Sequence, residues 1–329
     1  MRWTAIGSGL FCPVAVSPRP GQLALFARSA TGELLDMRWE DGRWGEIRSL
    51  GVPAVRTAGV PDPVPVDWPL AACTGGGKRI HLFARSPDGD LLHMSGDGTE
   101  WGAFECLGAP ASSDAGVAIP IGLVGPPAAC SAPPDRIDVF AAGQTGEVLH
   151  TGWNGAGWSG FESLGVPALR LGGRDRSVPL SGPFAACRSG IDRMALFARG
   201  SAGDLMARWW DGTRWEDFAS LGWPELQDET YPAVAFPIAL TGPPAACGGA
   251  DRIDVFARGA RGEILHRSWN GREWGEYRSL GMPVTADAER QLLPSTGAIS
   301  ACSWGPDRLD VFTRAVDGRV YHCFWDGRT

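Results

Sequence analysis

The stretch Asp251-Arg-Ile-Asp-Val-Phe-Ala-Arg258 decides the fold, because near copies of it recur along the whole chain. Each copy is followed by a glycine six residues after its phenylalanine, and most copies then carry Trp-Asp/Asn-Gly, a second tryptophan and Ser-Leu-Gly. A repeat of this length predicts a solenoid, an array or a propeller. Successive copies are 57, 57, 57, 59 and 56 residues apart, counted from Phe26, Phe83, Phe140, Phe197, Phe256 and Phe312.

One repeat predicts four strands. Residues 251–258 alternate apolar and polar side chains, and Gly259-Ala-Arg-Gly262 supplies the glycines of a tight hairpin. Residues 263–269 alternate again, Asn270-Gly271 is a strong turn signal, and residues 274–280 form a further strand. Upstream, Pro244-Ala-Ala-Cys247 is small enough for a crowded innermost strand. Six four-stranded antiparallel meanders without a helical period predict an all-β, six-bladed propeller.

The two ends of the sequence complement each other. The last repeat stops at Trp325-Asp-Gly-Arg-Thr329, before its second tryptophan, whereas Met1-Arg-Trp3 resembles Arg272-Glu-Trp274 of the fifth repeat. An N-terminal strand is therefore expected to complete the last blade and close the ring. We expect a single domain over residues 1–329, with repeat units at 10–51, 71–108, 128–165, 185–222, 245–281 and 300–329, the last completed by 1–9.

Charge and hydropathy limit the classes of binding partner that the protein can have. The net charge is -7, from 30 basic and 37 acidic residues, and no basic run is present, which argues against nucleic acid and anionic membranes. No apolar stretch of about 18 residues predicts a membrane span. The N-terminus lacks the pattern of a secretion signal, so we expect a cytoplasmic protein. The sequence says nothing of the oligomeric state.

The cysteines recur with the repeat and predict no disulfide framework. Six of the eight are expected at equivalent blade positions, on different innermost strands, which would keep them too far apart to pair. We expect buried free thiols, which favours a reducing compartment. These six are Cys12, Cys73, Cys130, Cys187, Cys247 and Cys302.

Four histidines share one repeat position, on the third strand of each blade. Their distance from the axis argues against a shared metal ion, and no metal or cofactor is expected. Twelve residues earlier stand Asp138 for His150, Asp254 for His266 and Asp310 for His322. The even separation across a hairpin predicts cross-strand Asp-His hydrogen bonds. In the second repeat the pair is His81 with His93.

Two tryptophans per repeat admit two interpretations. The first-set tryptophans precede the third turn and the second-set tryptophans follow it. Either set could wedge neighbouring blades together, or present indole faces on which a pyranose stacks. The first set comprises Trp39, Trp153, Trp210, Trp269 and Trp325; the second comprises Trp3, Trp44, Trp101, Trp158, Trp215 and Trp274.

The combined motif of Asp-Arg-Ile-Asp-Val-Phe-Ala-Arg-Gly, Gly-x-x-Leu-His-x-x-Trp, Asn/Asp-Gly-x-x-Trp and Ser-Leu-Gly resembles the repeat of bacterial fucose-binding propeller lectins, over all six repeats. The resemblance implies a lectin with several shallow sugar sites between neighbouring blades. The stacking platforms would be the first-set tryptophans. Their hydrogen-bonding partners would be Arg28, Arg199, Arg258 and Arg314 at the ends of the second strands.

Five connections of roughly twenty residues between repeats keep a second function open. The resemblance leads us to expect relatives with seven blades of shorter repeats and without such connections. Long loops are often functional, and we expect these five on one face, around the mouth of the central channel. There they could form the pocket of an enzyme for a small organic substrate, although the common catalytic motifs are missing. The candidate pocket residues are Trp68, Arg174, Asp175, Arg176, Glu229, Tyr231, Glu289 and Arg290.

Overall fold

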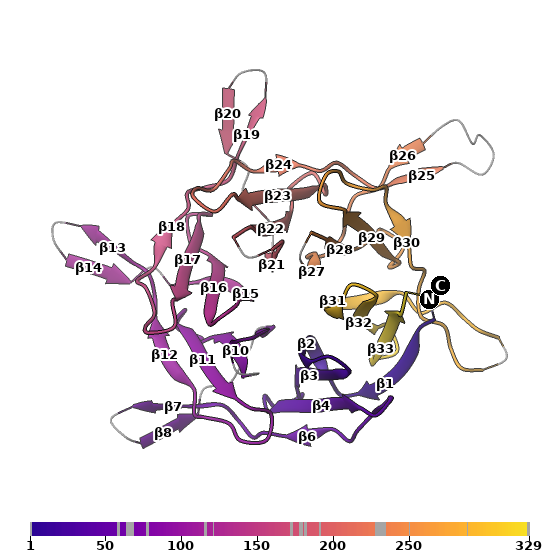
Figure 1. Cartoon of the computed structure of the whole chain (residues 1–329), viewed down its shortest axis with the longest axis horizontal. Coiled ribbons are helices and arrows are strands. Elements are labelled where there is room, and N and C mark those ends of the chain that lie inside the picture. Colours follow the sequence, from indigo (N-terminus) through magenta and orange to yellow (C-terminus); the bar gives the residue numbers. More distant parts are fainter. Residues whose placement is uncertain are drawn as a thin grey trace.

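The chain folds into six antiparallel sheets arranged in a ring, which confirms the six-bladed propeller (Figure 1). The computed structural model describes residues 2–57, 60–63, 69–76, 79–114, 117–120, 122–171, 174–177, 180, 183–190, 192–227, 235–249, 251–287 and 289–327. In each blade the second strand carries the repeat phenylalanine, and all six of these side chains are fully buried.

The strands of the first three blades run outward from the centre of the ring. Blade 1 contains β2 (Phe11–Arg19), β3 (Gln22–Arg28), β4 (Leu34–Glu40), β5 (Arg43–Trp44) and β6 (Arg48–Ser49). Blade 2 contains β9 (Ala71–Thr74), β10 (Ile80–Arg85), β11 (Leu91–Gly96) and β12 (Glu105–Gly108). Blade 3 contains β15 (Val124–Ala132), β16 (Arg136–Ala142), β17 (Val148–Trp153) and β18 (Glu162–Ser163).

The other three blades follow the same order. Blade 4 contains β21 (Ala185–Arg188), β22 (Met194–Arg199), β23 (Leu205–Trp210) and β24 (Ala219–Ser220). Blade 5 contains β27 (Ala245–Gly248), β28 (Ile253–Arg258), β29 (Ile264–Trp269) and β30 (Arg278–Ser279). Blade 6 contains β31 (Ser295–Gly305), β32 (Arg308–Ala315) and β33 (Arg319–Trp325).

The N-terminal strand completes blade 6, as the two ends of the sequence predict. Strand β1 (Thr4–Ser8) pairs antiparallel with β33, from Thr4 opposite His322 to Ser8 opposite Arg319. The sheet order is β1-β33-β32-β31, and both termini lie at this blade in Figure 1. Because β1 covers the outer edge of β33, the last blade has four strands, as blade 5 has.

The apolar core consists of six clusters that each join two neighbouring blades and a small seventh cluster within blade 6. Phe26 of blade 1 clusters with Leu82 of blade 2, for example, and Phe256 of blade 5 clusters with Val311 of blade 6. Burial of these side chains between blades, rather than in one central core, is what holds the ring together. Because the six interfaces are built from equivalent positions, a polar residue that is present in only one of them can be recognised by comparison with the other five.

The expected gathering of the long connections at the channel mouth is not what the fold shows. Four connections form two-stranded hairpins that extend outward from the ring, and the gold connection between β30 and β31 also projects outward (Figure 1). The two strands of each hairpin pair their backbone N-H and C=O groups with each other, so the hairpins do not depend on hydrogen bonds to residues at the channel. The hairpins are β7 (Ala54–Thr57) with β8 (Val60–Pro63), β13 (Ala111–Asp114) with β14 (Val117–Pro120), β19 (Ala168–Leu171) with β20 (Arg174–Ser177), and β25 (Glu225–Gln227) with β26 (Ala235–Pro237).

All eight cysteines are free thiols, and five of the six repeat cysteines are buried. Burial raises the pKa of Cys130 to about 12, so this thiol stays protonated. Cys12 corrects the sequence-based assignment. It lies four residues before Val16, which pairs with Ala24 as Cys302 pairs with Asp310, so Val16 occupies the equivalent position.

No helix within the described ranges is long and apolar enough to cross a membrane.

Candidate functional site

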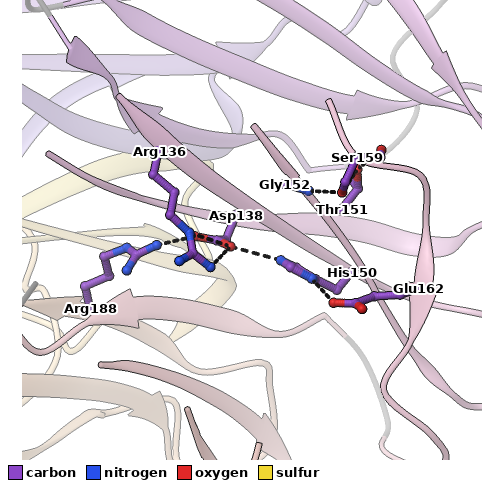
Figure 2. Close-up of polar contacts among 8 residues, drawn as sticks. All are labelled: Arg136, Asp138, His150, Thr151, Gly152, Ser159, Glu162 and Arg188. Atoms are coloured by element: carbon purple, nitrogen blue, oxygen red, sulfur yellow. Dashed lines mark hydrogen bonds and ion pairs between the residues drawn. The ribbon is translucent and has the colours of Figure 1, made fainter. Parts of the chain in front are cut away.

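A row of polar side chains crosses the face of blade 3 that packs against blade 4. Asp138 lies on β16, His150 on β17 and Glu162 on β18, and His150 pairs directly opposite Glu162 in the sheet. In an antiparallel sheet, side chains at such positions share one face. Figure 2 shows these three residues in line, with Arg136 beside Asp138 and Arg188 approaching from blade 4.

The polar atoms in this row bind one another. His150 Nε2 lies 3.0 Å from Asp138 Oδ1, and His150 Nδ1 lies 2.6 Å from Glu162 Oε1. Arg136 donates to both carboxylate oxygens of Asp138, with Nε 3.0 Å from Oδ2. Arg188, on the innermost strand of blade 4, donates to the same Oδ2. Asp138 therefore accepts hydrogen bonds from three side chains, one of which comes from the next blade.

These contacts shift the titration of both central groups. Burial raises the pKa of Asp138, but hydrogen bonds from His150 and Arg136 and the charge of Arg188 outweigh it, and the pKa is lowered overall. Burial lowers the pKa of His150, but the hydrogen bonds to Asp138 and Glu162 outweigh it, and that pKa is raised. The row thus favours an imidazolium held between two carboxylates.

The predicted Asp-His pairs are confirmed in the other two blades that carry them. His266 Nε2 lies 2.7 Å from Asp254 Oδ1, and His322 Nε2 lies 2.7 Å from Asp310 Oδ1. The second repeat differs, because His81 Nδ1 faces His93 Nε2 at 2.9 Å. The pairs vary from one blade to the next, so the six grooves are not chemically equivalent.

Tryptophans of the following blade form the opposite wall of these grooves. Trp215 meets Phe140 edge to face with ring centroids 5.6 Å apart, and Trp158 meets His93 at 5.3 Å. The two tryptophans of one blade also touch, as Trp153 and Trp158 do at 5.8 Å. All five first-set tryptophans are half-buried, so packing accounts for much of their surface. Sugar stacking on them stays a prediction.

The arginines expected beside those tryptophans lie at the other end of each blade. In blade 5, Trp269 pairs with Ile253, whereas Arg258 pairs with Ile264, five residues further along β28. Five residues of strand span about 16 Å. The register therefore does not bring the arginine and tryptophan of one blade together.

These arginines contact the connection that leads to the next blade instead. Arg199 donates to the carbonyl of Leu240, and Arg258 donates to the carbonyls of Thr241 and Gly297. Arg314 stacks over Phe11, with its guanidinium carbon 4.6 Å from the ring centre. Arg28 closes the corresponding strand β3 of blade 1. The positions of Arg199 and Arg258 indicate that they anchor the chain as it enters the next blade.

The residues of the alternative pocket are not gathered in the described structure. Trp68, Glu229 and Tyr231 lie outside the described residues. Arg174, Asp175 and Arg176 belong to β20, in a hairpin that extends away from the ring, and only their backbone is described (Figure 1). Glu289 and Arg290 are exposed in the outward connection between blades 5 and 6.

A cavity of about 890 Å³ lies between the inner hairpins of blades 5, 6 and 1. It combines two indoles, Trp269 and Trp304, with the guanidinium of Arg252 and the carboxylates of Asp251 and Asp254. Ser17, Ser268, Asn270 and Ser303 add further polar groups to the wall. Trp269 was a sequence-based candidate. Trp304 was not predicted. It lies two residues after the repeat cysteine, at a position where the other repeats have small residues: Gly75, Ala132, Ser189 and Gly249.

The residue after the repeat cysteine explains why this groove is open and the groove of Figure 2 is filled. In blade 4 that residue is Arg188, which occupies the groove and binds Asp138. In blade 6 it is Ser303, too short to reach Asp254, which is bonded by Arg252 and His266 of its own blade. Asp254 consequently lines the cavity.

The blade number, the strand order and the closure by β1 define a six-bladed β-propeller with polar and aromatic grooves between its blades. Solved lectins share this fold. A six-bladed fucose-recognising lectin from Aleuria aurantia is 17% identical, with 97% of this chain and 94% of that chain covered and a TM-score of 0.62. AofleA from Arthrobotrys oligospora is 16% identical, with coverages of 98% and 86% and a TM-score of 0.63.

A bacterial structure is similar to the same degree. BP39L lectin from Burkholderia pseudomallei is 18% identical, with 98% of this chain and 97% of that chain covered and a TM-score of 0.60. The chain therefore has the fold of these propeller lectins, as the repeat motif indicates. The expectation of seven blades is wrong for the Aleuria aurantia lectin, which has six. No protein-family model matches the chain, and no curated protein matches it.

Proposed function

We propose that the protein is a non-enzymatic lectin that binds a saccharide in the groove between blades 5 and 6, at the cavity lined by Trp269 and Trp304. The observation that supports this most is the combination of two indoles, two guanidinium groups, those of Arg19 and Arg252, and two carboxylates around one space of about 890 Å³. Specific ligand sites typically combine a largely apolar wall with a few polar groups that fix orientation.

The chemistry of the wall suits a pyranose. An indole offers an apolar face to the C-H side of the sugar ring, while Asp251, Asp254 and Asn270 accept or donate hydrogen bonds to hydroxyl groups. Arg252 is already held against Asp254 by bonds of 2.7 and 2.9 Å, so its remaining N-H groups are oriented before a ligand arrives. Charged donors and acceptors form the stronger hydrogen bonds, which offsets the cost of desolvating sugar hydroxyls.

Fucosides are the first ligands to test. The similar Aleuria aurantia lectin was solved with Fucα1-6GlcNAc, and the similar SapL1 lectin with α-methyl fucoside. We expect fewer sites than blades, because the groove between blades 3 and 4 is filled by Arg188 and the fourth repeat has Ala195 and Ala207 in place of an Asp-His pair. Within the described residues, no observation favours the enzyme alternative, since the connections that suggested it extend outward.

A glycan array followed by titration calorimetry tests the proposal. Trp304→Ala introduces the residue that the third repeat carries at Ala132, and it should weaken saccharide binding at least tenfold while the protein stays folded. Leu292→Ala removes an exposed apolar side chain outside the cavity and serves as the matched control. Unchanged affinity in the Trp304→Ala protein would show that this groove is not the site, and the absence of any glycan ligand would argue against a lectin.

A further inference from the structure

A second cavity, of about 690 Å³, opens between blades 4 and 5 where the outer strands meet the β25-β26 hairpin. It does not share any lining residue with the cavity at Trp304. Blade 4 and its hairpin contribute Leu221, Gly222, Trp223, Glu225 and Pro237, and blade 5 contributes Arg267, Glu276 and Tyr277.

The lining of this cavity departs from the other repeats at three positions. The residue two places after the conserved leucine is Trp223 here, but Val52, Ala109, Val166 or Met282 elsewhere. Two residues later stands Glu225, where the other repeats have Ala54, Ala111, Ala168 or Val284. The third departure is Tyr277, where the equivalent residues are Ile6, Ile47, Phe104, Phe161 and Phe218.

The fold alone does not require these three side chains, because other repeats build the same blade with small or apolar residues. Trp223 and Glu225 come from one blade and Tyr277 from the next, yet all three line one cavity. Independent departures that converge in space point to a ligand rather than to packing. They give this groove an aromatic ring, a carboxylate and a phenol that the others lack.

The polar side chains of the cavity are held in place, but not all of their hydrogen-bonding capacity is taken up within the protein. The Tyr277 hydroxyl is buried and makes no hydrogen bond of good geometry among the described residues, although it interacts with the nearby guanidinium of Arg267. Arg267 is fixed by its Nε bond of 2.8 Å to the carbonyl of Gly275 and by a bond to the carbonyl of Leu221, and its guanidinium carbon lies 5.0 Å from the centre of the Tyr277 ring.

Trp223 is unusually accessible for this chain. Trp223 is 42% exposed. Its indole N-H donates to the carbonyl of Ala202 at 3.2 Å, and this hydrogen bond holds the ring in place. A fixed, exposed indole loses little conformational entropy when a ligand stacks on it. Glu225 and Glu276 are both exposed at the cavity and can accept hydrogen bonds from hydroxyl groups.

We propose that this groove is a second saccharide site, present once per chain, that takes a pyranose residue without an acidic group. The pyranose would stack on Trp223 and share its hydroxyls between Glu225 and Glu276, beside the ring of Tyr277. Two carboxylates against one guanidinium disfavour a sialic or uronic acid in the same space. This inference rests on the proposed lectin function, but it concerns a different cavity and can fail separately.

The repeats themselves supply the variant that tests it. Trp223→Val, Glu225→Ala and Tyr277→Phe together convert the groove to the form found between blades 3 and 4, with Val166, Ala168 and Phe218, and the triple variant is therefore expected to fold. The probes are free neutral monosaccharides, fucose and galactose among them, with glucuronic acid as the acidic comparison. Calorimetric titration of the parent, the triple variant and Trp304→Ala gives the number of sites and their affinities.

The expected result is two sites for a neutral sugar in the parent, of which the triple variant loses one and Trp304→Ala loses the other. If the triple variant keeps every site, the inference is wrong while the lectin function stands. If the triple variant alone abolishes binding, the groove at Trp223 is the site and the one at Trp304 is not. Tighter binding of glucuronic acid than of neutral sugars at Trp223 would overturn the assigned ligand class, and no binding in any protein would overturn both proposals.

Discussion

Arg188 of blade 4 donates a hydrogen bond to the carboxylate of Asp138 in blade 3, across the interface between the two blades. Both side chains are buried, with 7% and 1% of their surfaces exposed. No other repeat has an arginine directly after its repeat cysteine. The contact therefore does two things at once: it joins two blades through a charged pair, and it occupies a groove that is otherwise related to the open one between blades 5 and 6.

Replacing this arginine should cost stability and open the groove. Arg188→Ser introduces the residue found at Ser303 of blade 6. The variant should lower the free energy of unfolding by roughly 2 kcal/mol, because Asp138 keeps Arg136 and His150 but loses one charged partner. The shift of the urea midpoint measures the loss.

The same variant should also change saccharide binding. With the guanidinium gone, the groove beside Asp138 resembles the one beside Asp254, and one additional weak saccharide site should appear in a calorimetric titration. Arg193→Ser removes an exposed arginine of the same blade and is the control for charge. A variant as stable as the parent, with no gain of a site, would mean that Arg188 neither ties the blades nor fills a binding groove.

The pair of histidines in blade 2 predicts a loss of stability in mild acid. Burial, followed by repulsion from His93, lowers the pKa of His81 from its ordinary value of 6.5 to about 4. Between these two values the unfolded chain binds more protons than the folded one, so stability falls as the pH drops from about 6.5 toward 4. At pH 5 the loss from this group should be about 1–2 kcal/mol.

His81→Asp should remove most of that loss. The aspartate recreates the Asp-His pair of blade 3, in which hydrogen bonds to Asp138 and Glu162 raise the pKa of His150. His81→Ala, which copies Ala195, removes the titrating group without adding a charge and serves as the comparison. Urea midpoints at pH 7.5 and pH 5 measure the effect. An equal loss in all three proteins would show that the buried histidine pair is not its cause.

The fold was predictable because its signals repeat. Six copies of one alternating pattern average out local ambiguity, and the match between Trp3 and Trp274 locates the closing strand. The same rule of equivalence failed at Cys12, which lies 14 residues before Phe26, whereas the other repeat cysteines lie nine or ten residues before their phenylalanines. Val16, ten residues before Phe26, occupies the repeat position, so an exact count along the sequence would have found it.

The site was predictable only in part, for the opposite reason. The Asp-His pairs depend on the spacing across one hairpin, which a sequence displays. The pairing of Arg258 with Trp269 was assumed from their presence in one repeat, whereas the sheet register places them at opposite ends of the blade. Trp304, Arg188 and Trp223 matter because they depart from the repeat, so comparing the repeats for differences rather than likenesses would have found them.

The first-set tryptophans away from the open grooves should act in packing rather than in binding. Trp153 contacts Trp158 and packs against the core cluster shared by blades 2 and 3. Trp153→Ala should lower the free energy of unfolding by about 2–3 kcal/mol, less than for a fully buried tryptophan because the ring is only half-buried.

Its saccharide affinity at a temperature well below the unfolding transition should equal that of the parent. Denaturant unfolding and calorimetry on the same preparation separate the two roles. A folded Trp153→Ala protein of normal stability that has lost a saccharide site would establish the stacking interpretation for this tryptophan.

The closing strand should be the structural element on which the whole ring depends. Deleting residues 1–9 removes β1 and exposes the outer edge of β33, where Thr4 now pairs with His322. The deletion also removes Trp3, whose indole N-H donates to the carbonyl of Leu280 in blade 5 at 3.0 Å, and thereby breaks a contact between the blades. An uncovered strand edge pairs readily with another chain, so the shortened protein should form oligomers at micromolar concentration.

A synthetic peptide of residues 1–9 should restore the oligomeric state of the parent protein when added in excess, because it can re-form the same strand pairing. A peptide with Trp3→Ser and Ile6→Asp should not, since Trp3 and Ile6 both pack against the apolar clusters beside blade 6. Size-exclusion chromatography with light scattering gives the mass in each case. If the shortened chain has the same oligomeric state as the parent and unfolds at the same urea concentration, ring closure by β1 contributes nothing to stability.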